Sequence, residues 1–139
     1  MIDFEYFTSK GDVKKQVKDE RLANLLIKES FDRLEFVKSL KLNEKNAKYI
    51  VENIYDTLRE LIEAKLALNG FKSYSHEATI LFLKKFPEFR ESEIRFMDNL
   101  RRIRNGIKYY GKGVEMDEAK KVIDFSRFIL PKLKLLVKK

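Results

Sequence analysis

The segment from Arg101 to Lys112, RRIRNGIKYYGK, carries five cations, two tyrosines and no acidic residue. A guanidinium group binds phosphate or carboxylate through a planar fork of N–H donors, and a lysine adds a compact positive charge. A tyrosine ring can stack on an unpaired base. Residues of these types, this close together, predict a surface that handles the phosphate groups of a nucleotide or of RNA.

A helix from Ser92 to about Tyr110 would position these side chains. At about 100° per residue, one side of that helix gathers a predicted core face of Phe96, Leu100, Ile103, Ile107 and Tyr110. A ridge of Met97, Arg101, Arg104 and Lys108 follows one flank of this face in steps of three or four residues, with Asn105 just beyond it. We therefore expect Arg104 at the border of the core, partly removed from water and in need of an anionic partner.

Two hypotheses supply that partner. In the first, a phosphate of a bound ligand lies against Arg104, because its own segment offers no carboxylate. In the second, a glutamate from another helix, such as Glu63 or Glu77, pairs with it and the other cations are simply solvated. Gly106 weakens its helix by about 1 kcal/mol relative to alanine, and either close approach of a ligand or fraying near the helix end would explain it.

The spacing of apolar residues predicts the other elements. We expect one long helix from Asp12 to about Leu40, and a second that begins after an Asn43 cap and ends at Asn69–Gly70. A short helix capped by Ser73 or Ser75 precedes Pro87, and a last helix capped by Asp117 reaches about Leu136, with Pro131 inside it. No strand-like alternation is evident. The sequence predicts an all-α, antiparallel up-and-down bundle of four to five helices, forming a single domain over residues 1–139.

Composition limits the classes of function. The net charge of +8 and a pI of about 9.5 favour a polyanionic partner such as nucleic acid, although ordinary solubility charge is the alternative. The chain has no cysteine and one histidine, which excludes disulfides and Cys- or His-rich metal sites. We therefore expect no metal and no cofactor. We expect neither a signal peptide nor a membrane span, hence a cytoplasmic protein. Abundant Lys, Arg and Glu with a single Gln is typical of a thermophile.

Two segments resemble the HEPN superfamily, the higher eukaryotes and prokaryotes nucleotide-binding domains. Arg104-Asn105-Gly106-Ile107-Lys108-Tyr109 is similar to the family's Arg-Asn-x-x-x-His signature. The segment EAKLALNGFKSYSHEATILFL, Glu63 to Leu83, resembles the family's helix end, glycine turn and histidine-led next helix. The likeness spans about Glu44 to Leu136.

The resemblance implies a bundle of four or five helices that forms a homodimer, with the two signature arginines facing a shared cleft. Many members are metal-independent endoribonucleases whose signature His and Arg act on the scissile phosphate and the ribose 2′-hydroxyl. Several are toxins paired with a minimal nucleotidyltransferase antitoxin, and others only bind nucleotide or RNA.

The chain departs from the catalytic pattern, because Tyr109 replaces the signature histidine. Tyrosine has an ordinary pKa near 10 and is a poor base at neutral pH. The toxins also carry a modified tyrosine two residues after that histidine, where this chain has Gly111. His76, the only histidine, either substitutes as an acid-base group or packs against the loop before its helix.

Three hypotheses follow from these residues together with the resemblance. The first is a dimeric HEPN-like protein that binds RNA or a nucleotide without cleaving it, within a toxin–antitoxin type pair; its binding residues are Arg101, Arg104, Asn105, Lys108 and Tyr109. The second is a metal-independent ribonuclease in which Arg104 stabilises the transition state and Tyr109 or His76 replaces the missing histidine. The third is an interaction subunit that docks on a protein partner such as a nucleotidyltransferase.

Overall fold

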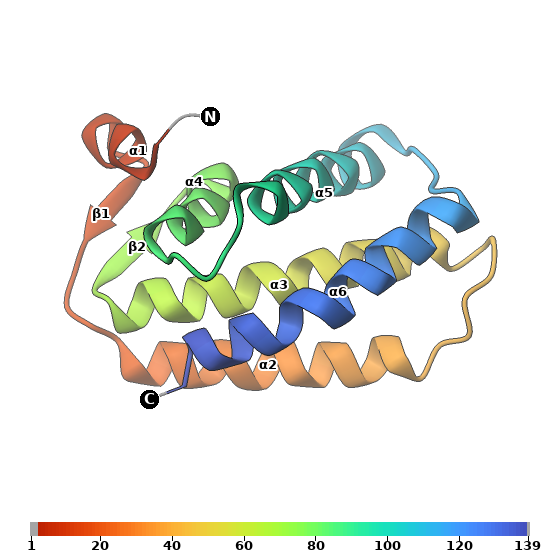
Figure 1. The fold of residues 1–139 in the computed structure, drawn as a ribbon, viewed down its shortest axis with the longest axis horizontal. Coiled ribbons are helices and arrows are strands. Elements are labelled where there is room, and N and C mark those ends of the chain that lie inside the picture. The colour runs from red at the N-terminus through yellow and green to blue at the C-terminus, as the bar shows by residue number, and fades with distance from the viewer. Residues whose placement is uncertain (1–2, 139) are drawn as a thin grey trace.

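The computed structural model describes residues 3–138 of the 139-residue chain. The elements in that part are α1 (Phe4–Lys10), β1 (Val13–Lys15), α2 (Glu20–Lys38), α3 (Ala47–Leu68), β2 (Phe71–Ser73), α4 (His76–Leu81), the 3₁₀ turn η1 (Phe82–Lys85), α5 (Glu91–Tyr110) and α6 (Met116–Leu136). Figure 1 shows the four long helices running alternately in opposite directions, with α1 and α4 as short additions. The predicted all-α helical bundle is confirmed.

Helix α3 is the centre of the core. Its predicted apolar stripe is buried throughout, with no residue more than 2% exposed: Ala47, Ile50, Val51, Ile54, Leu58, Leu61, Ile62 and Leu66. Helices α2, α6, α4 and α5 all pack against it. Each large aliphatic side chain removed from water in this way contributes about 1.5–3 kcal/mol, so α3 organises the fold.

The N-terminal prediction was partly wrong, because only Glu20–Lys38 of the helix expected from Asp12 to about Leu40 is helical, and Val13–Lys15 is a strand. Helix α1 ends at Gly11, which has a φ of +91°, and β1 follows. Helix α2 then begins only at Glu20, after Asp19 accepts a hydrogen bond from the Leu22 N–H at 2.9 Å. Val13 is 1% exposed, so the apolar residue that suggested a helix serves the core from a strand instead.

A two-stranded antiparallel ladder joins the segments on either side of α2 and α3, and the sequence analysis did not predict it. The register pairs Val13 with Ser73, Lys14 with Lys72 and Lys15 with Phe71. The predicted stop at Asn69–Gly70 is confirmed, and Gly70 has a φ of +80°. A Cβ at Gly70 would lie 2.9 Å from the Gln16 carbonyl oxygen, so glycine is needed for this close approach.

The helix caps follow the sequence to different degrees. The Ser75 hydroxyl accepts from the Ala78 N–H at 3.1 Å, as predicted. Helix α3 starts later than the Asn43 cap suggested, because the Asn43 side chain accepts from Lys45 and Asn46 in a turn before the helix. Helices α5 and α6 begin at Glu91 and Met116, one or two residues before the predicted starts at Ser92 and Asp117. Helix α6 ends at Leu136, as predicted, with Pro131 inside it.

None of the helices in residues 3–138 combines the length and apolar character that a membrane-spanning segment needs.

Candidate nucleic-acid interface

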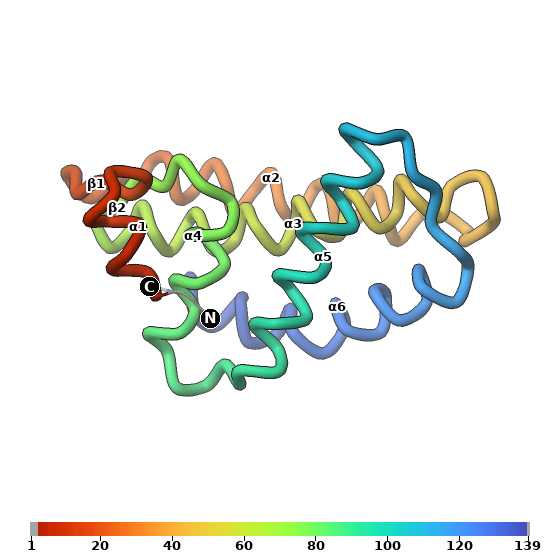
Figure 2. The backbone as a smooth tube through the Cα atoms, turned by 90° about the horizontal axis from the view of Figure 1, so that it is seen from above, coloured from red at the N-terminus to blue at the C-terminus, as the bar shows by residue number. Residues whose placement is uncertain are grey.

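Helix α5 presents a different face to the core from the one that its sequence predicts. Its buried residues are Glu93, Ile94, Met97, Leu100, Arg104 and Gly106, whereas Tyr110 is 77% exposed. Figure 2 shows α5 running obliquely, from the side of α6 at its beginning to the side of α3 at its end. Because of this angle a cleft of about 190 Å³ separates α5 from α6, and Phe96 and Ile103 line it half-buried.

Arg104 lies inside the core rather than at its border. The residue is only 6% exposed. Its Nη2 lies 3.5 Å from the Asp56 Oδ1 on α3, and its guanidinium carbon lies 5.9 Å from the centre of the Tyr55 ring. Of the two hypotheses for its partner, a carboxylate from another helix is the one observed, but the residue is Asp56 and neither Glu63 nor Glu77.

The other charges around Arg104 are matched in the same way. Arg59 on α3 binds Glu63 at 2.8 Å and Asp56 at 3.4 Å, so the Asp56 Oδ1 is shared by two arginines. Arg101 binds Asp98 at 2.9 Å on its own helix. We call Tyr55, Asp56, Arg59, Glu63, His76, Asp98, Arg101 and Arg104 the buried polar cluster. Its three arginines and three carboxylates balance, so it does not present a net positive charge to a ligand.

Three polar atoms in this cluster are buried without a hydrogen-bond partner among residues 3–138: the Tyr55 hydroxyl, the Arg59 Nε and the Arg104 Nε. Burial raises the pKa of Tyr55, against the opposing effect of Arg59, Arg101 and Arg104, so the phenol stays neutral. Buried donors without a partner cost stability, and they concentrate at sites that hold water, ions or substrates in many proteins. The packing between α3 and α5 is therefore held by a loose ionic contact.

His76 is the first residue of α4 and belongs to the buried polar cluster. Its ring centre is 6.3 Å from that of Tyr55. Burial lowers the pKa of His76, and the positive charge of Arg59 adds to that effect. The imidazole is therefore neutral at neutral pH, in a half-buried position between α3 and α4.

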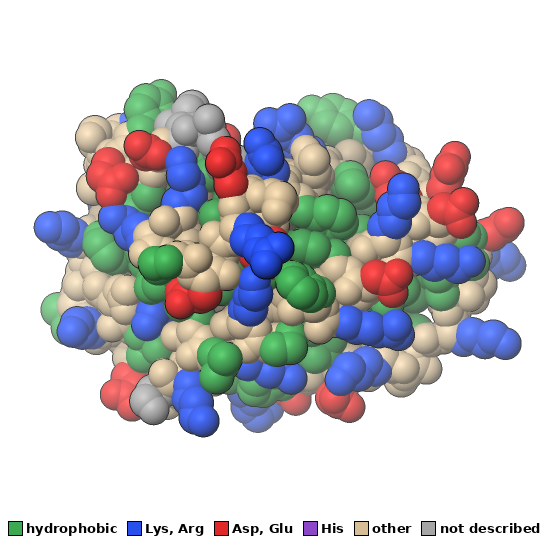
Figure 3. Space-filling model, viewed as in Figure 1, with side chains coloured by type: hydrophobic (Ala, Val, Ile, Leu, Met, Phe, Trp, Pro, Cys, Tyr) green, Lys and Arg blue, Asp and Glu red, His purple; other side chains and the backbone are tan. Residues whose placement is uncertain are grey.

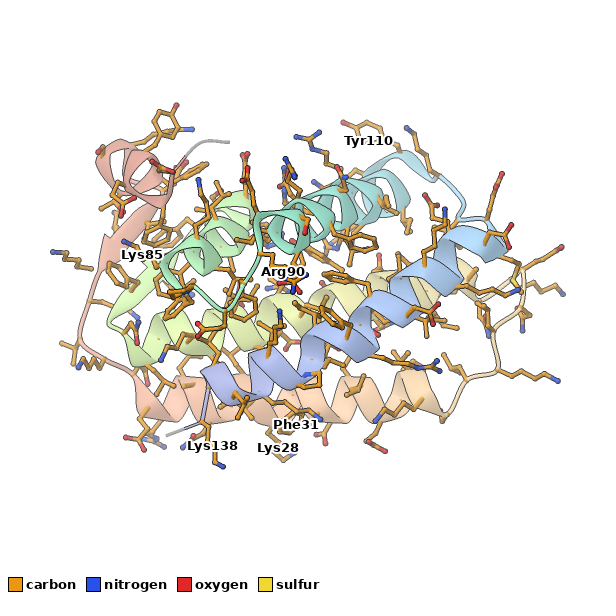
Figure 4. All side chains as sticks on the ribbon, in the orientation of Figure 1. Lys28, Phe31, Lys85, Arg90, Tyr110 and Lys138 are labelled. Atoms are coloured by element: carbon orange, nitrogen blue, oxygen red, sulfur yellow. The ribbon has the colours of Figure 1, made fainter. Side chains whose placement is uncertain are left out.

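The end of α5 is the exposed part of the predicted ridge. Tyr109 is 64% exposed, and the Nζ of the exposed Lys108 lies 5.6 Å from the centre of its ring. The Arg102 side chain is 68% exposed, with its Nη2 3.4 Å from the Asp98 Oδ2. Tyr110 projects from the end of the helix (Figure 4). Gly111, with a φ of +62°, ends the helix, and the Lys112 N–H donates to the Gly106 carbonyl at 3.1 Å. We call Arg102, Asn105, Lys108, Tyr109, Tyr110 and Lys112 the α5 tip.

The structure thus divides the five predicted binding residues. Arg101 and Arg104 belong to the buried polar cluster, whereas the exposed Lys108 and Tyr109 and the half-buried Asn105 belong to the α5 tip. The proposed catalytic pair is not brought together, because Arg104 points into the core while Tyr109 faces solvent.

The sequence analysis missed Asp56 and Arg59, the partners that fix the cluster. The signal was present, since Asp56, Arg59 and Glu63 follow each other at steps of three and four residues along the same helix. Charged residues at that spacing form one stripe on a helix face. The face that shows in Figure 3 mixes Lys and Arg with Asp and Glu over several elements, and no histidine is visible on it.

In the described part of the chain, no group of three or more His, Asp or Glu side chains has the arrangement needed to hold a metal ion.

Comparison with protein-family models finds none that matches this chain, and comparison with curated proteins finds no matching sequence. The resemblance to the HEPN superfamily therefore stays a prediction.

Proposed function

We propose that this chain is a HEPN-like protein that binds single-stranded RNA or a nucleotide through the α5 tip, without cleaving it. The observation that carries the proposal is the exposed Tyr109 with Lys108 over its ring, in a segment of five cations and no acidic residue. A lysine beside an exposed ring offers a phosphate contact and a stacking surface together. The net charge of +8 would favour the encounter with a polyanion.

The place of the ligand in this proposal differs from the one that the resemblance implies. The family's signature arginine faces a cleft, but Arg104 would have to leave Asp56 to do so. In this proposal Arg104 holds α5 against α3 through Asp56, and Arg101 is engaged by Asp98 on its own helix. The exposed cations of the tip, Arg102, Lys108 and Lys112, meet the phosphates. Two copies of the chain would associate as the resemblance implies, which sedimentation velocity tests.

Titration of a fluorescein-labelled oligouridylate, followed by anisotropy over a series of salt concentrations, tests the proposal. The Lys108→Ala/Tyr109→Ala variant should bind at least tenfold more weakly, because one phosphate contact and one stacking surface are lost. A matched control is Phe31→Ala/Lys134→Ala, where the lysine Nζ lies 5.4 Å from the centre of the Phe31 ring. Figure 4 labels Phe31 and Tyr110 at opposite edges of the molecule. Equal affinities of the two variants would reject the α5 tip as the site.

A metal-independent ribonuclease is the second candidate, and one observation favours it. His76 and Arg104 both lie against Tyr55, so a neutral imidazole and a guanidinium are close to one buried phenol. Incubation of the oligouridylate with the protein in EDTA tests this candidate. Cleavage that is lost in His76→Gln and kept in Tyr109→Phe would support it, whereas intact RNA would favour binding alone.

The third candidate, an interaction subunit of a nucleotidyltransferase pair, makes a different prediction. The α5 tip would then dock on an acidic protein surface. Recovery of the chain with a protein and without nucleic acid would favour this candidate over RNA binding.

A further inference from the structure

The two-stranded ladder places two lysines directly opposite each other. Lys14 on β1 and Lys72 on β2 are register partners, and both are exposed. Like charges in opposed positions of an antiparallel pair are destabilising. Among residues 3–138, neither lysine has a carboxylate within ion-pair distance, so no ion pair in that part of the fold offsets the repulsion.

An exposed aromatic ring lies beside these two lysines. Tyr74 is 66% exposed, and its ring centre is 5.8 Å from the Lys14 Nζ and 6.0 Å from the Lys72 Nζ. The backbone that carries the ring is fixed, since the Tyr74 N–H donates to the Asp12 carbonyl at 2.7 Å. A ring and two cations are therefore presented together by a rigid ladder.

Two acidic side chains on the segments next to the ladder are engaged by other groups. The Asp12 carboxylate pairs with Lys10 at 3.3 Å, and the Asp19 carboxylate caps α2 by accepting from the Leu22 N–H. These two carboxylates therefore do not neutralise Lys14 or Lys72. Figure 1 shows that β1 and β2 lie at the end of the molecule opposite to the C-terminal end of α5.

We propose that Lys14, Lys72 and Tyr74, which we call the ladder site, form a second contact for single-stranded nucleic acid. The two ammonium groups bind phosphate oxygens, and a base stacks on the Tyr74 ring. An acidic peptide would pair with the two lysines but would not contact the exposed Tyr74 ring. A single-stranded nucleic acid offers both phosphates for the lysines and bases for the ring, so it fits the site better. The inference depends on the nucleic-acid binding of the proposed function, but not on its α5 tip.

The Lys14→Thr/Lys72→Thr variant separates binding from folding. Threonine suits strands and the substitution removes the repulsion, so the melting temperature should stay the same or rise. For the labelled oligouridylate, the plot of the logarithm of the association constant against the logarithm of salt concentration should become shallower. The magnitude of its slope should decrease by about 1.4, at about 0.7 for each of two lost phosphate contacts on a single strand. Lys120→Gln/Lys121→Gln removes the same charge from exposed positions on α6 and should leave the slope unchanged.

The Tyr74→Ala variant tests the stacking part. Its affinity should fall about tenfold at every salt concentration, with the slope unchanged, because a ring contact releases no counterions. The exposure of the ring means that the variant keeps its fold.

The other possible results of these measurements distinguish the ladder site from the α5 tip. Wild-type affinity and slope in both ladder variants would overturn the inference while leaving the α5 tip intact, and a wild-type protein that binds no oligouridylate would overturn both proposals. Loss of binding in the ladder variants but not in Lys108→Ala/Tyr109→Ala would support the ladder site and reject the α5 tip. Binding of polyglutamate as tightly, with lysine dependence and no Tyr74 dependence, would assign the surface to an acidic protein and overturn the inference.

Discussion

Arg104 on α5 and Asp56 on α3 form a buried ion pair across the core, with 3.5 Å between the Nη2 and the Oδ1. Their side chains are 7% and 13% exposed. The same carboxylate oxygen also lies 3.4 Å from Arg59, and the Arg104 Nε has no hydrogen-bond partner in the described part of the chain. The pair therefore ties the oblique end of α5 to the central helix, with fewer hydrogen bonds than the groups could make.

Arg104→Met should lower the free energy of unfolding by about 3 kcal/mol. Removing one partner of a buried pair costs roughly 3–5 kcal/mol, and the lower end applies here because Asp56 keeps Arg59. Asp56→Asn should cost more, since two arginines then lose their shared carboxylate. Urea unfolding measures both, with the exposed Arg102→Ala as a control that changes stability by less than about 0.5 kcal/mol. A loss of under about 1 kcal/mol in Arg104→Met would show that the pair does not hold α5.

Gly106→Ala should raise the free energy of unfolding by about 0.5–1 kcal/mol, because alanine suits a helix interior better than glycine. A Cβ at Gly106 would meet the Lys112 Cδ at 3.2 Å, at the flexible end of a side chain that can move aside. Thermal unfolding measures the change. A stabilised variant that binds RNA more weakly would show that the ligand, rather than the fold, needs glycine at this position, and a destabilised variant would show that Lys112 cannot move.

His76 should titrate with a pKa below its ordinary 6.5, since burial and then Arg59 disfavour the imidazolium, with Arg104 acting in the same direction. The unfolded chain then takes up a proton more readily than the folded one. Stability from this residue is therefore lost as the pH falls through about 6.5. As His76 is the only histidine, its imidazole signals in an NMR titration need no assignment. A value at or above 6.5 would contradict its described surroundings, which include Tyr55, Asp56, Arg59, Glu63 and Arg104.

Glu93 should make the wild type sensitive to acid. Burial raises its pKa, but the Arg90 N–H at 2.7 Å and the Lys132 Nζ at 2.9 Å together outweigh that effect and lower it. A carboxyl with a lowered pKa contributes stability above its ordinary pKa of 4.5, and this is lost as the pH falls through the folded value. Between pH 5 and about pH 3 the free energy of unfolding of the wild type should therefore decline more steeply than that of Glu93→Gln. Parallel curves would show that Glu93 keeps its ordinary pKa.

The long helices could be predicted because their signals are local. The apolar stripe of α3, the Gly70 stop and the Ser75 cap depend on neighbouring residues, and all three are observed. The ladder could not be predicted, since Val13–Lys15 and Phe71–Ser73 are short and acquire their structure only by pairing across the intervening helices.

The candidate site was predicted less well than the helices. Periodicity identified the ridge of α5, but the angle at which α5 crosses α3 decided that Met97 and Arg104 would be buried and Tyr110 exposed. That angle is a property of the packed bundle and not of one helix. The search for the partner of Arg104 could have been narrowed to α3, where Asp56, Arg59 and Glu63 recur at steps of three and four residues.

A single tryptophan at position 109 tests the central claim most directly, because the chain has none of its own. If the α5 tip binds single-stranded RNA, a base stacks on the indole ring of Tyr109→Trp, and its fluorescence emission should be quenched as oligouridylate is added. The midpoint of the quenching should equal the midpoint of the binding curve measured by anisotropy. Phe128→Trp, on the exposed side of α6, should keep its emission. Binding by anisotropy with unchanged emission at position 109, or no binding at all, would contradict the account.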